Sequence, residues 1–84
     1  MTEDQTEVLI VDDDSLVRSA VKRVLNNASF KVVSASSAHE ALSLLRAGRT
    51  FAVIVTDLVM PGTGGTQFIR LLRQFDRDTP VIVF

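Results

Sequence analysis

The chain alternates between short apolar runs and longer segments in which apolar residues recur at helical spacing. The runs at 8–11, 30–35, 51–55 and 80–84 are rich in β-branched residues, and they predict four strands. The runs at 8–11 and 51–55 are continuously apolar, which is typical of strands buried on both faces of a parallel sheet. The run at 30–35 is more polar, so we expect that strand nearer an edge of the sheet.

Three amphipathic segments lie between these runs and predict helices. The first spans 16–28, and either Asp14 or Ser15 can cap its start. The apolar stripe expected to face the sheet consists of Leu16, Val17, Ala20, Val21, Val24, Leu25 and Ala28. The basic residues expected on its solvent side are Arg18, Lys22 and Arg23.

The second and third helices have clear boundary signals. Ser37 and Glu40 form a predicted capping box at the start of the second helix, and Gly48 offers a left-handed stop at its end. A glycine-rich loop precedes the third helix. The inner side of this helix is expected to consist of Phe68, Ile69, Leu71, Leu72 and Phe75.

Strict alternation of strand and helix favours an α/β fold, a doubly wound parallel sheet with helices on both faces. With strand order 2-1-3-4, the first and third strands are neighbours, about 4.8 Å apart. The crossovers from the first strand to the second and from the second to the third run in opposite directions across the sheet. The crevice beyond the carboxyl ends of the first and third strands is therefore the switch point, where open α/β sheets bind ligands.

Acidic residues follow both of these central strands. Asp12, Asp13 and Asp14 come directly after the first strand and Asp57 directly after the third, so we expect carboxylates to converge. Crowded carboxylates must take up protons or share a cation, and oxygen ligands favour Mg²⁺. With a metal bound, one carboxylate can attack a phosphoryl donor and form an aspartyl phosphate. An aspartate after a strand is also often a cap, which is the role expected of Asp14.

Composition argues against other kinds of site. The 84 residues include no cysteine and one histidine, His39, which is remote from the acidic strand ends, so zinc or copper is not expected. The formal net charge of −1 gives no general attraction to nucleic acid or membrane. Residues 1–7 are polar, unlike a signal peptide, and no apolar run approaches the roughly 20 residues that span a bilayer. We expect a cytoplasmic protein.

Two motifs resemble those of a known family. The segment from Val11 to Arg18 looks like the acidic-pair motif that opens the receiver domains of bacterial two-component response regulators, which have a flavodoxin-like fold. The segment from Asp57 to Gly62 resembles the phosphorylation-site motif of the same family. Asp57 follows Asp13 by 44 residues, an interval typical of receivers, and the similarity extends over 8–84.

The resemblance implies a role for each matching residue. Asp57 would be the phosphoacceptor, and a sensor histidine kinase or a histidine phosphotransfer protein would be the donor. Mg²⁺ would be bound by Asp13 and Asp57, by Asp12 directly or through water, and by the backbone carbonyl of Val59. The domain would be regulatory rather than a turnover enzyme, and it would switch a C-terminal output domain.

The sequence departs from the family pattern in two places. Gly64-Gly65 stands where many receivers have Asp-Gly, which would remove a helix cap without touching a catalytic group. The fifth strand, the last two helices, and the Ser or Thr and the Lys that sense the phosphoryl group have no counterpart here. We therefore expect 1–84 to be a single receiver domain, incomplete at its C-terminus, with 1–7 as a polar extension. Its fourth strand would be an exposed edge through which chains self-associate.

Two other functions stay open. Asp12-Asp13-Asp14 contains the Asp-x-Asp of haloacid-dehalogenase-type phosphatases, with Asp12 as nucleophile. That motif wants Thr or Val where this chain has Leu16, and it gives no role to the motif at Asp57. The other alternative is a receiver-like module that is not phosphorylated and only binds a partner.

Overall fold

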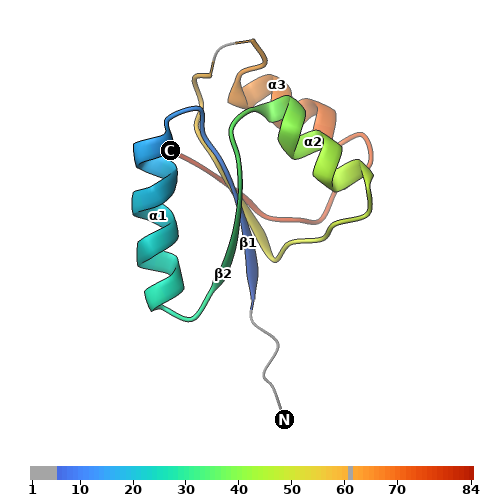
Figure 1. Cartoon of the computed structure of the whole chain (residues 1–84). Coiled ribbons are helices and arrows are strands. Elements are labelled where there is room, and N and C mark those ends of the chain that lie inside the picture. Colours follow the sequence, from blue (N-terminus) through green and yellow to red (C-terminus); the bar gives the residue numbers. More distant parts are fainter. Residues whose placement is uncertain (1–5, 61) are drawn as a thin grey trace.

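The computed structural model describes residues 6–60 and 62–84, which form a four-stranded parallel sheet and three helices (Figure 1). The strands are β1 (Glu7–Val11), β2 (Lys31–Ala35), β3 (Val53–Thr56) and β4 (Val81–Val83). The helices are α1 (Ser15–Asn27), α2 (Ala38–Arg46) and α3 (Gly65–Leu72). The strand order is β2-β1-β3-β4, which confirms the predicted doubly wound sheet and its central pair.

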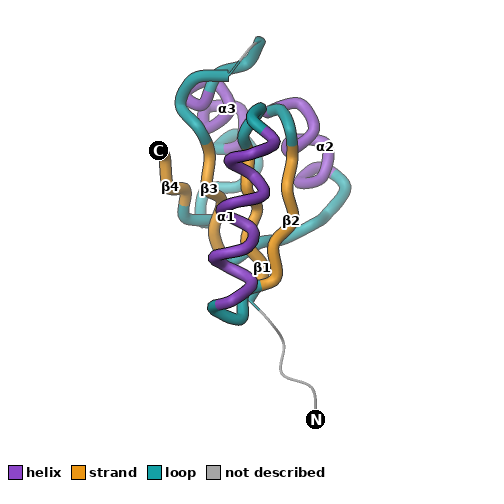
Figure 2. Tube along the Cα trace, turned by 60° about the vertical axis from the view of Figure 1, so that its left-hand side comes forward, coloured by secondary structure: helices purple, strands orange, loops and turns teal. Residues whose placement is uncertain are grey.

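The helices cover the sheet unequally. Helix α1 lies on one face, and α2 and α3 lie on the other (Figures 1 and 2). The core between the sheet and α2 and α3 is the larger one. Its buried residues are Leu9, Val11, Ala35, Ala38, Ala41, Leu42, Leu45, Phe51, Ile54, Met60, Phe68 and Leu72. Alternate residues of β1 point to opposite faces of the sheet. Leu9 and Val11 therefore belong to this core, while Val8 and Ile10 face α1.

The α1 face has a smaller core, built on Val8, Ile10 and Val32. Val21 and Leu25 of α1 pack against it, yet none of the 13 residues of α1, all of them described, is buried. The predicted stripe was too broad, because Leu16 and Val24 are 79% and 66% exposed.

The geometry of a helix explains this difference. Residues four apart lie in one row along a helix, and neighbouring residues lie about 100° apart around its axis. The row of Val17, Val21 and Leu25 faces the sheet. The row of Leu16, Ala20 and Val24 lies beside it and faces solvent, because no second helix packs there among the described residues.

The helix ends follow most of the predicted signals. Asp14 is the N-cap of α1, and its Oδ1 accepts hydrogen bonds from the Leu16 and Val17 N–H groups at 2.9 and 3.5 Å. Ser37 caps α2 through the Glu40 N–H at 3.1 Å. The Glu40 carboxylate bonds the N–H of Ser36 at 2.6 Å, one residue earlier than a standard capping box. Gly48 has the expected left-handed conformation, with φ +98°.

Phe75 differs from the prediction. It was expected on the inner side of the third helix, but α3 ends at Leu72 and Phe75 is 46% exposed. The chain turns after α3, where the Asp76 N–H bonds back to the Leu72 carbonyl at 2.9 Å. The Phe75 ring lies instead under the Arg46 guanidinium, whose carbon is 5.9 Å from the ring centroid. Because the helix ends before Phe75, helical spacing could not predict which way this side chain faces.

The last strand forms an edge of the described sheet, as predicted. β4 pairs with β3 on one side, and Ile82, Val83 and Phe84 are each about half exposed. Among residues 6–60 and 62–84, no helix has the length and apolar character that crossing a membrane requires.

Candidate functional site

The pairing of β1 with β3 brings their two acidic ends together. The strands run in register, with Val11 beside Thr56, and the Asp57 N–H continues the ladder to the Val11 carbonyl at 3.0 Å. On the other side, the Asp12 N–H bonds the Ala35 carbonyl of β2 at 3.1 Å. The backbone of both aspartates is therefore fixed by sheet hydrogen bonds. Their convergence follows from the strand order.

Three carboxylates meet at this point. Asp12, Asp13 and Asp57 each offer an oxygen, and these oxygens lie within 4.8 Å of one another. Asp12 is buried, Asp57 is half-buried and Asp13 is exposed, so the cluster opens to solvent on one side. Asp14 serves the helix as its cap, as predicted. The structure thus brings together the three aspartates that sequence analysis assigned to a metal.

The electrostatics of the cluster favour a cation. Burial raises the pKa of Asp12, which is only 2% exposed, and the charges of Asp57, Asp13 and Asp14 raise it further. A hydrogen bond from the Asp14 N–H to Asp12 Oδ1, at 2.9 Å, offsets part of this rise. The ionised form of Asp12 is therefore disfavoured while these charges lack a counter-ion.

The donor set fits a hard divalent ion. Three carboxylates with an opening to solvent suit Mg²⁺, which takes oxygen ligands and keeps several waters. Asp57 is held in place from the loop that follows it, because the Val59 N–H donates to its Oδ1 at 3.2 Å. The Val59 carbonyl as a further ligand stays a prediction. Pro61 of the same motif lies outside the described residues.

Arg18 belongs to the surroundings of the site, although sequence analysis placed it on the solvent side of its helix. Its Nη1 donates to the Asp12 carbonyl at 2.7 Å, and the residue is half-buried. The side chain reaches back over the first turn of α1 to the loop that carries the acidic residues. The sequence contained one signal for this contact. Side chains on a helix lean toward its N-terminus, so a long side chain in the first turns can reach the loop that precedes the helix.

Gly65 is a second residue that sequence analysis undervalued. A Cβ atom on Gly65 would lie 2.5 Å from the Asp57 carbonyl oxygen and 2.9 Å from the Leu58 Cα. The Gly65 N–H also donates to the Leu58 carbonyl at 2.8 Å. The prediction that the glycine pair removes a cap is confirmed at Gly64, which makes no side-chain cap bond. Gly65 also lies directly against the backbone of Asp57, a close approach that the prediction for the glycine pair did not include.

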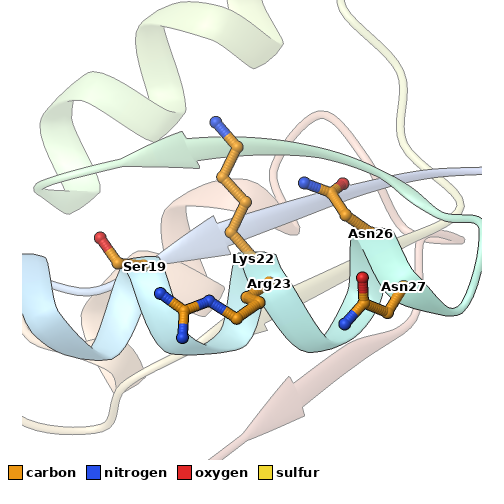
Figure 3. Close-up of a pocket in the computed structure, with 5 residues that line it drawn as sticks. All are labelled: Ser19, Lys22, Arg23, Asn26 and Asn27. Atoms are coloured by element: carbon orange, nitrogen blue, oxygen red, sulfur yellow. The ribbon is translucent and has the colours of Figure 1, made fainter.

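A separate hollow lies on the exposed side of α1, away from the carboxylates (Figure 3). The residues that line it are Ser19, Lys22, Arg23, Asn26 and Asn27. All five are exposed, and they include no carboxylate or imidazole that could serve as a base. This hollow therefore has no part in the site at the strand ends.

Comparison with known proteins identifies the family. The sequence profile described as "Response regulator receiver domain" matches residues 8–84. The chain is 37% identical over 79 residues to the C4-dicarboxylate transport transcriptional regulatory protein DctD of Pseudomonas aeruginosa, covering 94% of this chain and 17% of the relative. It is 37% identical over 76 residues to the response regulator MprA of Mycolicibacterium vanbaalenii, covering 90% of this chain and 32% of the relative.

Solved structures agree. The chemotaxis protein CheY4 of Vibrio cholerae superposes with a TM-score of 0.88 at 32% identity, covering 95% of this chain and 68% of that chain. A response regulator receiver protein from Pseudomonas putida gives 0.88 at 30% identity, covering 98% and 69%. The chain therefore belongs to the response-regulator receiver family, whose members are signalling domains of two-component systems. It spans about a third or less of the two curated relatives named above.

Proposed function

We propose that Asp57 accepts a phosphoryl group from a sensor histidine kinase or a histidine phosphotransfer protein. The Mg²⁺ ion that this transfer requires would be held by Asp12, Asp13, Asp57 and the Val59 carbonyl. The observation that carries the proposal is the meeting of three carboxylate oxygens within 4.8 Å at the switch point of a receiver fold. Membership of the receiver family supports the same assignment.

The chemistry assigns one task to each aspartate. An Asp57 oxygen forms a bond to phosphorus while the donor's N–P bond breaks, and the electron pair of that bond returns to the histidine nitrogen. The Val59 N–H holds Asp57 Oδ1, which leaves the second oxygen as the nucleophile. When bound, Mg²⁺ neutralises charge on the phosphoryl oxygens. Asp12 and Asp13 would hold the cation beside Asp57, so positioning and charge would supply the catalysis.

The phosphatase alternative fits the structure poorly. It requires Asp12 as nucleophile and Asp14 as the second aspartate of the motif. Asp12 is 2% exposed, and Asp14 Oδ1 is engaged by the first N–H groups of α1. The half-buried Asp57 is the more accessible nucleophile. We therefore propose a regulatory phosphoacceptor rather than a turnover enzyme.

The cellular setting follows from this role. We propose that residues 8–84, the region matched by the receiver family, act as one cytoplasmic receiver unit. The relatives named above extend well beyond the matched region, and the transcriptional regulatory protein DctD is one of them. An output domain outside the present chain would report the phosphorylation.

Self-association through β4 is part of the proposal. Among the described residues no strand pairs with the outer side of β4, which carries three half-exposed apolar residues, and such an edge can pair with a second copy. Sedimentation should show association that rises with protein concentration. A Val83→Lys chain should associate less, because lysine on an edge strand opposes pairing. Unchanged association in that variant would exclude β4 as the interface.

The metal site is tested by a Mg²⁺ titration followed by ¹⁵N NMR. We expect weak binding that Asp13→Asn and Asp57→Asn abolish, because each removes a charged ligand. Asp14→Asn is the matched control, since it also removes one negative charge but keeps the cap acceptor. Equal losses in Asp14→Asn and Asp13→Asn would show that the ligand assignment is wrong.

A further inference from the structure

Arg18 makes two contacts with the loop that carries the acidic residues. Its Nη1 donates to the Asp12 carbonyl at 2.7 Å, and its backbone N–H donates to the Asp14 carbonyl at 3.0 Å. The two acceptors lie on either side of Asp13. A third bond inside the loop, from the Asp14 N–H to Asp12 Oδ1 at 2.9 Å, closes the turn. One residue of α1 therefore holds both ends of the segment that contains Asp13.

We propose that Arg18 is a positioning residue that keeps the Asp12–Asp14 loop in the shape in which its carboxylates share a cation with Asp57. The inference rests on the proposed function, because it assumes that these carboxylates bind Mg²⁺. Arg18 contacts a carbonyl rather than a carboxylate oxygen, so it leaves the ligand atoms free. Its role is to fix the backbone from which the ligands project.

The surroundings of Asp12 explain why this contact matters. Asp12 is nearly inaccessible to water, so its carbonyl depends on protein donors for hydrogen bonding. The guanidinium supplies a charge-assisted bond to this carbonyl. Without it the loop keeps the sheet bond from the Asp12 N–H, the turn bond at Asp14 and the backbone bond from the Arg18 N–H, but the Asp12 carbonyl loses its link to α1. Asp13, which is exposed, then has a less defined position.

A positioning role and a purely electrostatic role of Arg18 predict opposite changes in Mg²⁺ affinity when Arg18 is replaced. The positive charge of Arg18 repels Mg²⁺, so a purely electrostatic role predicts tighter metal binding when that charge is removed. A positioning role predicts weaker binding. Groups that orient metal ligands typically contribute about 10- to 100-fold to metal affinity. The sign of the change therefore separates the two explanations.

Arg23 provides the matched control. It lies on the same helix, is exposed and lines the hollow of Figure 3. Arg23→Ala removes the same charge as Arg18→Ala but leaves the contact to Asp12 in place. Arg18→Lys keeps the charge and a donor without the fixed fork of the guanidinium.

The experiment is a Mg²⁺ titration of the 84-residue chain by ¹⁵N NMR, with hydrogen exchange at the Asp14 amide measured in the metal-free protein. We expect Arg18→Ala to weaken Mg²⁺ binding roughly tenfold and to speed exchange of the Asp14 amide. Arg18→Lys should recover part of the affinity, and Arg23→Ala should change neither quantity. If Arg18→Ala does not fold, Arg18→Lys compared with wild type carries the test, with weaker binding still expected.

The outcomes separate this inference from the function on which it rests. If the wild-type chain shows no Mg²⁺-dependent shift, the metal site itself is refuted. If the wild type binds Mg²⁺ and Arg18→Ala binds it as tightly or more tightly, with unchanged exchange at Asp14, the positioning role alone is overturned.

Discussion

The two faces of the sheet differ in what they contribute. On one face, the short helices α2 and α3 supply four and three buried residues. On the other, the longest helix, α1, supplies none, although all 13 of its residues are described. Yet the acidic loop caps α1 through Asp14, and Arg18 of α1 contacts Asp12. The α2–α3 face thus provides most of the apolar burial, and the N-terminal turns of α1 contact the acidic loop.

Phe68→Ala should have the largest effect on stability. Phe68 is fully buried in the core of α2 and α3, and removing such a side chain typically costs about 3–5 kcal/mol. Leu25→Ala is the control on the α1 face, where the half-buried side chain should cost less. Urea unfolding gives both free energies. If Phe68→Ala leaves no folded protein, Phe68→Leu and Leu25→Val replace the two variants, with an expected loss of about 1 kcal/mol at Phe68. A larger loss at Leu25 would break the comparison of the two faces.

Gly65→Ala should have the next largest effect. It tests the place where α3, on the well-packed face, meets the backbone of Asp57 in the site. The new Cβ would meet backbone atoms of Asp57 and Leu58 at 2.5 and 2.9 Å, and these cannot move aside as a side chain can. Overpacking of this kind costs about 1–3 kcal/mol. Gly64→Ala is the control, because its nearest contact would be 3.3 Å. Thermal unfolding and the NMR shift of the Asp57 amide should both change more in Gly65→Ala. Equal changes would contradict the close approach of α3.

Asp12→Asn tests how much the buried negative charge at the acidic strand ends lowers the stability of the metal-free chain. The pKa of Asp12 is raised above its ordinary value of 3.8, chiefly by burial, so the folded chain binds this proton more tightly than the unfolded chain. Metal-free stability is therefore lost as the pH rises from 3.8 through the raised pKa. Asn keeps the Oδ1 acceptor for the Asp14 N–H and removes the charge.

Thermal unfolding in EDTA checks this pH dependence. Asp12→Asn should be the more stable chain at pH 7, and its advantage should shrink as the pH falls through the raised pKa toward 3.8, because the wild-type carboxyl becomes protonated in the folded chain. The comparison with wild type at each pH cancels the titration of other groups. A variant that is less stable at neutral pH would show that burial does not penalise the charge.

Leu16→Ala should have the smallest effect. Leu16 is 79% exposed, and substitutions at such positions usually stay within about 0.5 kcal/mol. Leu72→Ala, a fully buried leucine on the opposite face, should cost about 2–5 kcal/mol. Urea unfolding of the two variants measures the contrast between the faces with one residue type. Equal losses would mean that the outer row of α1 is covered in solution.

The carboxylates that directly follow the two central strands were predictable. Asp12 and Asp57 directly follow buried strands, and the order of a parallel sheet determines where strand ends meet. Arg18 was not predictable in the same way, because its role depends on a side chain that reaches back to the carbonyl of Asp12. Gly65 was missed because the sequence shows a weak cap but not the approach of α3 to the Asp57 backbone.

The fold was predicted better than the exposure of its helices. Periodicity identified each helix, but it could not show that one row of α1 stays in solvent. Leu16 and Val24 are apolar in the sequence whether or not another element packs on them. Phe75 continued the pattern of α3 by spacing, although the helix ends three residues earlier. Such errors arise where burial depends on elements that local sequence does not contain.

The central claim is that Asp57 accepts a phosphoryl group, and intact-mass spectrometry after treatment with acetyl phosphate tests it most directly. We predict that the wild-type chain slowly gains the mass of one phosphoryl group, that EDTA prevents the gain, and that peptide mapping places it on Asp57. Asp57→Ala should gain nothing, while Asp14→Asn should react like wild type. A modification that persists in Asp57→Ala, or a wild-type chain that stays unmodified with Mg²⁺ present, would contradict the account.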